Sequence, residues 1–383
     1  MILDKPYVSK ETKEYLEQSQ TGVLRNNTAQ EESQGYNINL KEKDEFLSML
    51  KNGQRLYTLS ENSLEWIYEN IPDQELLRCI NTMKNKTSFR NATQELFPDL
   101  FYKEAGLEEL NKLDFSKLPV PFVIKPATGF FSVGVYVISN LDDWNHAIKE
   151  INKNIKKWSM NYPQKVIDNS TYILEEFIHG EEYAIDAYYD ENGNAVVLNI
   201  MKHDFSSTKD VSDRLYYTSK EIIKEKLDIL TAFLNKVNQN IKAVNFPFHA
   251  EVRIDKDKIV PIEFNPMRFA GWCCTDLTYF AFGFKTYDYY FNNIRPDWNE
   301  ILKDKEHKLF SLIVLDKYKD YISGDTFDYD SLHDYFNKVL CIRKLDPEIN
   351  PVFGFVFTET DDDNTKELEN IVKSDLKEFT HKK

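Results

Sequence analysis

The sequence lacks the features that mark membrane, secreted and nucleic-acid-binding proteins. It has no apolar run of membrane-spanning length, and residues 1–10 lack the apolar segment of a secretory signal. Lysine and arginine number 48 against 63 aspartates and glutamates, so the net charge is −15. This acidic balance argues against broad contact with nucleic acid or an anionic membrane surface.

Cysteine is also scarce. The four cysteines are Cys79, Cys273, Cys274 and Cys341, and no pair has the CxxC spacing of a zinc or redox site. Reduced thiols in a reducing compartment are therefore expected, which predicts a cytoplasmic protein.

The chain is long enough for two or three packed units, because it has 383 residues of which 42% are hydrophobic. Predicted strands alternate with single helices, which is typical of the α+β or α/β class. Residues 1–40 are polar and predict a loosely packed arm or surface helix. A final helix is predicted over residues 365–379.

Residues 248–265 predict a β-hairpin that carries acidic side chains. A three-residue turn centred on Asp257 would set Glu251 directly opposite Glu263. Like charges opposed on a sheet repel each other, so a cation is expected between them. Two carboxylates with the amide oxygen of Asn265 suit Mg²⁺, which takes hard oxygen ligands.

Alternation along the hairpin decides which side chains share a face. It places Arg253 on the face of Glu251, and it places Ile262 and Phe264 on the face opposite to Glu263. The alternative interpretation is a solvent-exposed strand face with scattered charges.

A second element is a lysine at the end of a predicted strand. Lys125 follows an apolar run, and a loop with two glycines and Ser132 follows it, from Gly129 to Gly134. Glycines let backbone N–H groups approach an anion closely, and a lysine adds charge, so this segment is a candidate phosphate cradle. It is not a Walker A loop, and a simple hairpin is the alternative.

A third element follows the predicted strand at residues 171–178. Its end reads Glu-Glu-Phe-Ile, and Gly180 and Glu182 come next. An extended hinge can bind adenine through its backbone, and a carboxylate a few residues on can reach ribose hydroxyls. An amphipathic hairpin with surface glutamates is the alternative.

The three elements in this order resemble the ATP-grasp superfamily of carboxylate–amine ligases, over residues 85–285. The resemblance implies an ATP-grasp fold with a two-lobed ATP-binding core, here residues 85–300, with a lid lobe at about 120–180. An N-terminal pre-ATP-grasp domain, residues 1–84, would precede it. A small α+β appendage, residues 301–383, would follow it.

The resemblance also implies ATP and Mg²⁺, or Mn²⁺, as ligands. It implies that Glu251, Glu263 and Asn265 hold the metal. The residues implied for the nucleotide are Lys86, Lys125, Ser132, Gly134, Glu175, Glu176, Phe177, Ile178 and Glu182. Lys84 is close enough to Lys86 to compete for its phosphate contact.

Two further side chains are implied in catalysis. Arg268 resembles the arginine that steadies the substrate carboxylate, although it follows Asn-Pro-Met here where the family often has Asn-Pro-Arg. Lys202 would reach the γ-phosphate, or it would be a surface lysine. Residues 269–276 and 213–217 would line the acceptor side or pack structurally.

The implied activity is ADP-forming ligation of a small-molecule carboxylate to an amine, such as an amino acid or peptide-like molecule, by a protein that relatives suggest to be a homodimer. Three alternatives stay open from the sequence. They are a carboxylase subunit that needs a biotin carrier, a nucleotide-binding regulatory protein without turnover, and an α+β protein that does not bind ATP.

Overall fold

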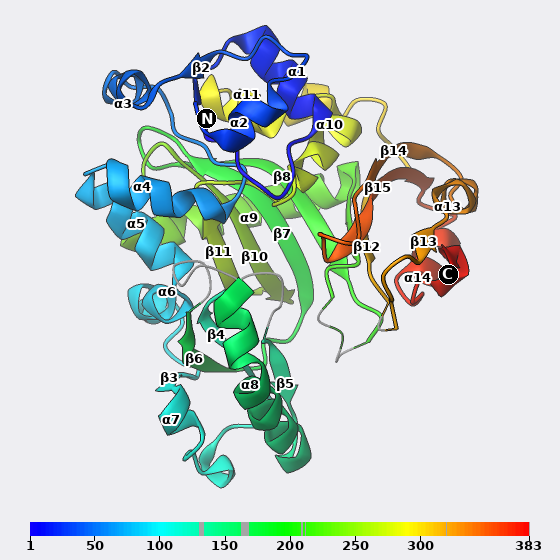
Figure 1. The fold of residues 1–383 in the computed structure, drawn as a ribbon. Coiled ribbons are helices and arrows are strands. Elements are labelled where there is room, and N and C mark those ends of the chain that lie inside the picture. The colour runs from blue at the N-terminus through cyan, green and yellow to red at the C-terminus, as the bar shows by residue number, and fades with distance from the viewer. Residues whose placement is uncertain (130–133, 162–167, 208–209, 211, 319, 383) are drawn as a thin grey trace.

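A central antiparallel sheet organises the computed structural model, which describes residues 1–129, 134–161, 168–207, 210, 212–318 and 320–382 (Figure 1). The sheet has eight strands in the order β11-β10-β7-β8-β9-β12-β15-β14. Their bounds are β7 Glu181–Tyr189, β8 Ala195–Asp204, β9 Leu215–Thr218, β10 Phe246–Asp255, β11 Lys258–Pro266, β12 Lys308–Asp316, β14 Val339–Lys344 and β15 Val352–Asp361.

Helix α9 (Lys220–Ile241) packs along β8. It buries Ile223, Leu230, Leu234 and Val237, which recur at helical spacing on one face. Ser219 caps its first turn by accepting a hydrogen bond from the Ile222 N–H. The helix therefore covers one face of the sheet by burying an apolar stripe.

The lid lobe lies below the central sheet in Figure 1 and has its own hydrophobic core. A four-stranded sheet in the order β3-β6-β4-β5 forms it with two helices. Their bounds are β3 Tyr102–Gly106, α7 Leu107–Leu110, β4 Phe122–Thr128, β5 Tyr136–Ile138, α8 Leu141–Asn161 and β6 Asp168–Glu176. Phe122, Trp144 and Leu174 are among the buried side chains of this core. A core separate from that of the central sheet is what a lobe needs to move as a body.

The N-terminal region packs against the central sheet. Met1, Ile2 and Leu3 are at most 2% exposed and belong to the same core cluster as the sheet. The expectation of a loosely packed arm is therefore wrong, because the first residues are anchored by backbone bonds such as Leu24 N–H to the Met1 carbonyl. The elements are α1 Lys10–Ser19, β1 Val23–Leu24, α2 Asn27–Glu32, β2 Leu40–Lys41, α3 Lys43–Lys51, α4 Leu64–Asn70, α5 Gln74–Lys84 and α6 Lys86–Thr93.

Three short helices follow β11, and the C-terminal region then continues the central sheet. The helices are α10 Leu277–Phe282, α11 Thr286–Phe291 and α12 Trp298–Ile301. Strands β12, β14 and β15 belong to the sheet itself. The remaining elements are β13 Thr326–Phe327, α13 Tyr329–Tyr335, α14 Lys366–Ile371 and β16 Thr380–His381.

The single helix predicted over residues 365–379 is wrong. Helix α14 ends at Ile371, and Leu376 adopts a positive φ of 62° that an α-helix does not tolerate. Across the described residues, no helix combines the length and apolarity needed to cross a bilayer.

Candidate active site: a cleft between the central sheet and the lid lobe

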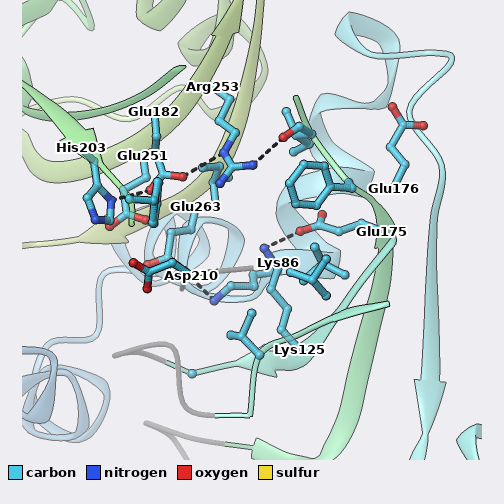
Figure 2. Close-up of a pocket in the computed structure, with 18 of the residues that line it drawn as sticks. Lys86, Lys125, Glu175, Glu176, Glu182, His203, Asp210, Glu251, Arg253 and Glu263 are labelled. Atoms are coloured by element: carbon cyan, nitrogen blue, oxygen red, sulfur yellow. Dashed lines mark hydrogen bonds and ion pairs between the residues drawn. The ribbon is translucent and has the colours of Figure 1, made fainter. Parts of the chain in front are cut away.

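A cleft opens between the central sheet and the lid lobe, and most of the sequence-predicted residues line it (Figure 2). It encloses about 1030 Å³, part of which is open to solvent. The predicted residues that line it are Lys86, Lys125, Glu175, Glu176, Phe177, Ile178, Glu182, Glu251 and Glu263. The predicted residues that do not line it, among those the structure describes, are Gly134, Lys202, Asn265 and Arg268. Ser132 lies outside the described residues.

Strand alternation turns Lys125 into the cleft. Ile124 belongs to the core of the lid lobe, and Val123 and Lys125 face the other way and line the cleft. The Lys125 ammonium pairs with the Glu175 carboxylate on the neighbouring strand. Burial lowers the pKa of Lys125, although the charge of Glu175 opposes that shift.

Helix α6 supplies two more cations. Lys86 and Arg90 are four residues apart and so share one face of the helix. Arg90 Nε donates to Glu175 Oε2 over 2.9 Å. Burial alone would raise the pKa of Glu175, but the charges of Arg90 and Lys125 outweigh it and lower the pKa to about 2. Glu175 is therefore ionised and is held between two cations, Arg90 and Lys125.

The acidic hairpin has the predicted pairing but a different turn. Glu251 lies directly opposite Glu263. The turn is shorter than expected, because Asp255 pairs with Lys258, and a β-bulge at Ile262 restores the register. The bulge also corrects the predicted face of Ile262, which lines the cleft beside Glu263.

Glu263 is held ionised in this arrangement. Lys86 Nζ lies 2.8 Å from Glu263 Oε2, and Asn265 Nδ2 donates to Glu263 Oε1 over 3.0 Å. Burial would raise the pKa of Glu263, but the Lys86 ammonium outweighs it and holds the pKa well below its usual range. Asn265 thus contacts Glu263, a candidate metal ligand, and does not itself line the cleft.

Comparison with known proteins places this cleft in a family. Residues 118–276 match the model of an ATP-grasp domain. The chain has an ATP-grasp domain. The match spans most of the lid lobe and the strands that carry Glu182, Glu251 and Glu263.

Individual relatives are distant. The alanine–anticapsin ligase of Bacillus subtilis strain 168 is 23% identical over 213 residues, which are 53% of this chain and 42% of that protein. This chain therefore matches less than half the length of that relative. Among solved structures, an L-amino acid ligase from Bacillus licheniformis superposes with a TM-score of 0.70 at 15% identity, covering 99% of this chain and 97% of that one.

A second solved neighbour was determined with nucleotide. It is the biotin carboxylase domain dimer of a 2-oxoglutarate carboxylase from Hydrogenobacter thermophilus, in complex with MgADP, ADP and bicarbonate. Its TM-score is 0.58 at 11% identity, covering 94% of this chain and 86% of that one. At these identities both structures support the ATP-grasp fold of this chain.

The ATP-grasp cleft continues across the central sheet in one row of side chains. Glu182 on β7 pairs with Arg253 on β10 and with His203 on β8. Its Oε1 lies 2.9 Å from His203 Nδ1, and its Oε2 accepts from Arg253 Nε over 2.9 Å. Burial opposes ionisation of Glu182, but these two partners outweigh it and lower the pKa of Glu182.

The same strand alternation takes Lys202 out of the cleft. Lys202 adjoins His203 on β8, so their side chains leave opposite faces of the sheet. Lys202 Nζ pairs with Glu181 Oε1 at 2.6 Å, and His203 lines the cleft instead. The γ-phosphate contact of Lys202 stays a prediction, and this geometry favours its alternative, a surface lysine.

Lys84 and Arg268 meet at Glu61, beside the ATP-grasp cleft. Arg268 Nη2 lies 2.8 Å from Glu61 Oε1, and the Lys84 ammonium pairs with the other oxygen of Glu61. Burial lowers the pKa of Lys84 well below its ordinary value, and the charges of Lys86 and Arg268 add to this shift. Lys86, not Lys84, therefore lines the cleft.

Some backbone N–H groups of the hinge after β6 already donate hydrogen bonds within the protein. The N–H of Glu176 donates to the Phe101 carbonyl and that of Phe177 to the Pro121 carbonyl. The Ile178 N–H has no hydrogen bond within the described part of the chain. Of these hinge amides, only that of Ile178 is thus open to a ligand.

Several cleft residues were not assigned from the sequence: His203, Asp210, Arg253 and Ile262. Arg90, which is buried behind the cleft and pairs with Glu175, was not assigned either. The spacing of Lys86 and Arg90 on one helix face was a usable signal for Arg90. Asp213, predicted only as part of an acceptor-side stretch, lines the cleft and accepts a hydrogen bond from the Tyr216 hydroxyl over 2.8 Å. Burial raises the pKa of Asp213 to about 7, and the charge of Glu251 adds to it.

The acidic pair fits a divalent cation. In the described residues no three His, Cys, Asp or Glu side chains converge as a metal site. The opposed residues Glu251 and Glu263 supply two carboxylates. Two carboxylates suit Mg²⁺, which is held by one or two of them and completes its octahedron with waters and phosphate oxygens.

Proposed function

We propose that the chain is an ATP-dependent, ADP-forming ligase that activates a carboxylate and joins it to an amine. The observation that carries this proposal is the directly opposed pair Glu251 and Glu263, with Lys86 and Lys125 in the same cleft. Two cations and an acidic pair in one cleft suit a polyphosphate with its metal ion. The named activities of the relatives, an alanine–anticapsin ligase and an L-amino acid ligase, support amino acids or peptide-like molecules as substrates.

The nucleotide would lie along the cleft from the hinge to the acidic hairpin. The open amide of Ile178 would bind the base, and Glu182 would accept from the ribose hydroxyls. Lys125 and Lys86 would neutralise the phosphates. Lys86 must then exchange its contact with Glu263 for a phosphate oxygen, since Glu263 is needed for the metal.

Glu251 and Glu263 would hold Mg²⁺ or Mn²⁺, and Asn265 would orient Glu263. A divalent cation there would supply charge neutralisation at the phosphates. The residues themselves bind and orient: Arg90 and Glu175 fix Lys125 at the base of the cleft, and they need no rearrangement to do so.

The chemistry requires two displacements. An oxygen of the substrate carboxylate attacks the γ-phosphorus, the bond to the bridging oxygen breaks, and ADP leaves. The amine nitrogen of the second substrate then attacks the acyl carbon, phosphate leaves, and the nitrogen loses a proton to solvent. Arg268, held at Glu61 beside the cleft, is our candidate for steadying the carboxylate. Closure of the lid lobe would keep water from the acyl phosphate.

Small-molecule substrates, a cytoplasmic location and a homodimer complete the proposal. The acidic net charge of −15 supports the first, since it disfavours polyanionic macromolecular partners. The four free cysteines support the second, since reduced thiols are typical of a reducing compartment. The dimeric biotin carboxylase domain among the fold neighbours supports the third.

The test combines MgADP binding with an ADP-release screen over pairs of amino acids. Wild type should bind MgADP, and at least one pair should release ADP. Glu263→Ala should lose at least about 100-fold in turnover, because it removes a ligand of the catalytic metal. Glu300→Ala is the matched control, since Glu300 is an exposed carboxylate that pairs with Lys303 and lies outside the cleft.

Two outcomes would contradict the proposal. MgADP binding with no turnover on any pair would favour the regulatory alternative. No binding of MgADP at all would remove the nucleotide site itself.

A further inference from the structure

Arg253 ties the floor of the cleft to the hinge. Its Nη1 donates to the Ile178 carbonyl over 2.7 Å, and its Nε donates to Glu182 Oε2 over 2.9 Å (Figure 2). The guanidinium also lies 5.1 Å from the centre of the Phe177 ring and 5.6 Å from that of Phe205. One planar side chain thus holds a hinge peptide and a carboxylate in the same cleft, and two aromatic rings flank it.

The contact with Arg253 distinguishes the backbone carbonyl of Ile178 from its backbone N–H. The carbonyl already accepts from Arg253, whereas the N–H has no partner in the portion of the chain that the structure describes. Because Ile178 lines the cleft, its hinge peptide offers a ligand a donor, while its acceptor is in use.

Whether a purine base can hydrogen-bond to this peptide depends on whether its N1 atom is an acceptor or a donor. The N1 atom of adenine is an acceptor and matches a free N–H. In hypoxanthine and guanine, N1 carries a proton, so a donor would face a donor and the buried hydrogen bond would be lost. Those bases would need the Ile178 carbonyl, which Arg253 occupies.

We propose that Arg253 is a specificity-determining positioning residue: by capping the Ile178 carbonyl and holding Glu182, it sets the cleft for a purine whose N1 is an acceptor. The proposal rests on the proposed function, since it requires the cleft to bind a nucleotide. A lysine at this position has one ammonium on a flexible stem, so it cannot hold the peptide and the carboxylate in the same fixed fork.

The experiment compares MgADP with MgIDP by calorimetry, because inosine differs from adenosine only at positions 6 and 1 of the ring. Wild type should bind MgADP at least about 100-fold more tightly. Arg253→Met frees the Ile178 carbonyl and should shrink the ADP-to-IDP ratio at least about 10-fold. Arg253→Lys should shift the ratio in the same direction, and it answers the question if Arg253→Met does not fold.

Lys258→Met is the matched control, since Lys258 is an exposed cation on the same hairpin, outside the cleft. It should leave the ratio at the wild-type value. If the Arg253 variants weaken both nucleotides equally and keep the ratio, Arg253 is only a structural tie and the proposal is overturned. If wild type binds neither nucleotide, the proposed function fails first, which is a different result.

Discussion

The two walls of the cleft differ in charge. The wall formed by the lid lobe and α6 presents Lys86 and Lys125 beside Glu175 and Glu176, and buried Arg90 lies behind it, where it shares Glu175 with Lys125. The wall formed by the central sheet and the segment between β8 and β9 presents mostly carboxylates: Glu182, Asp210, Asp213, Glu251 and Glu263. A bound polyphosphate would find its countercharges on the first wall, and it would need a cation of its own to approach the second.

Lys86 is where the two walls touch. It is the lysine that pairs with Glu263, whereas Lys84, two residues earlier, is buried against Glu61. Helix α5 ends at Lys84 and α6 begins at Lys86, with Asn85 between them as the cap of the second helix. Because one helix ends and the next begins between them, the two lysine side chains point in different directions and make different contacts.

The largest effect is expected when the two lysines, Lys86 and Lys84, are substituted separately. Lys86→Met should weaken MgADP binding by about 10- to 100-fold, since a charge-assisted contact to phosphate is lost. Lys84→Met should leave that affinity within about 3-fold of wild type and lower the free energy of unfolding by about 2–4 kcal/mol, because it leaves buried Glu61 short of a partner. Calorimetry and urea unfolding on both variants check this.

The same two variants can also contradict this distinction between Lys84 and Lys86. Equal losses of MgADP affinity in Lys84→Met and Lys86→Met would mean that the distinction between the two side chains is wrong, and that both contact phosphate.

The next effect is expected from the acidic wall, through the pH dependence of stability. The pKa of Asp213 is raised from 3.8 to about 7 in the folded protein, so between these values the folded state holds a proton that the unfolded state has lost. The stability that this proton contributes is fully present below pH 3.8 and is lost as pH rises through 7. Asp213→Asn stays neutral, so its unfolding free energy should gain about 4 kcal/mol relative to wild type between pH 4 and 8.

Urea unfolding across that pH range measures the difference. The charge of Glu251 contributes to the raised pKa of Asp213, so Glu251→Gln is the matched control and should reduce the pH dependence without abolishing it. A constant difference between wild type and Asp213→Asn over the whole range would show that Asp213 is ionised in the folded state.

Local alternation explains which parts of this site could be predicted from the sequence. Glu251 and Glu263 were predicted to be opposed and are, because each lies on a strand whose polar residues repeat every second position. The prediction was right for an incomplete reason, since the bulge at Ile262 compensates for a shorter turn. Bulges depend on packing across the whole sheet, which the hairpin sequence alone does not contain.

Long-range pairing explains what the sequence concealed. Residues 1–40 are polar in composition, but the first three, Met1 to Leu3, are apolar and buried, and backbone hydrogen bonds from distant segments reach them. Arg90 and Glu175 are 85 positions apart, and their pairing follows from the docking of α6 on the lid sheet. Polar composition predicts exposure only where no distant segment supplies partners.

The smallest effect is expected at Lys202, on the face of the central sheet turned away from the cleft. Lys202→Ala removes only a contact with half-exposed Glu181, so kcat and KM for ATP should stay within about 3-fold of wild type. His203→Ala, one residue later, leaves Glu182 with Arg253 alone and should raise KM for ATP by about 10-fold. Steady-state kinetics on the two variants compare neighbouring residues of one strand on opposite faces. A large loss in Lys202→Ala with none in His203→Ala would mean that β8 presents its other face to the nucleotide, and that the predicted γ-phosphate contact of Lys202 is right.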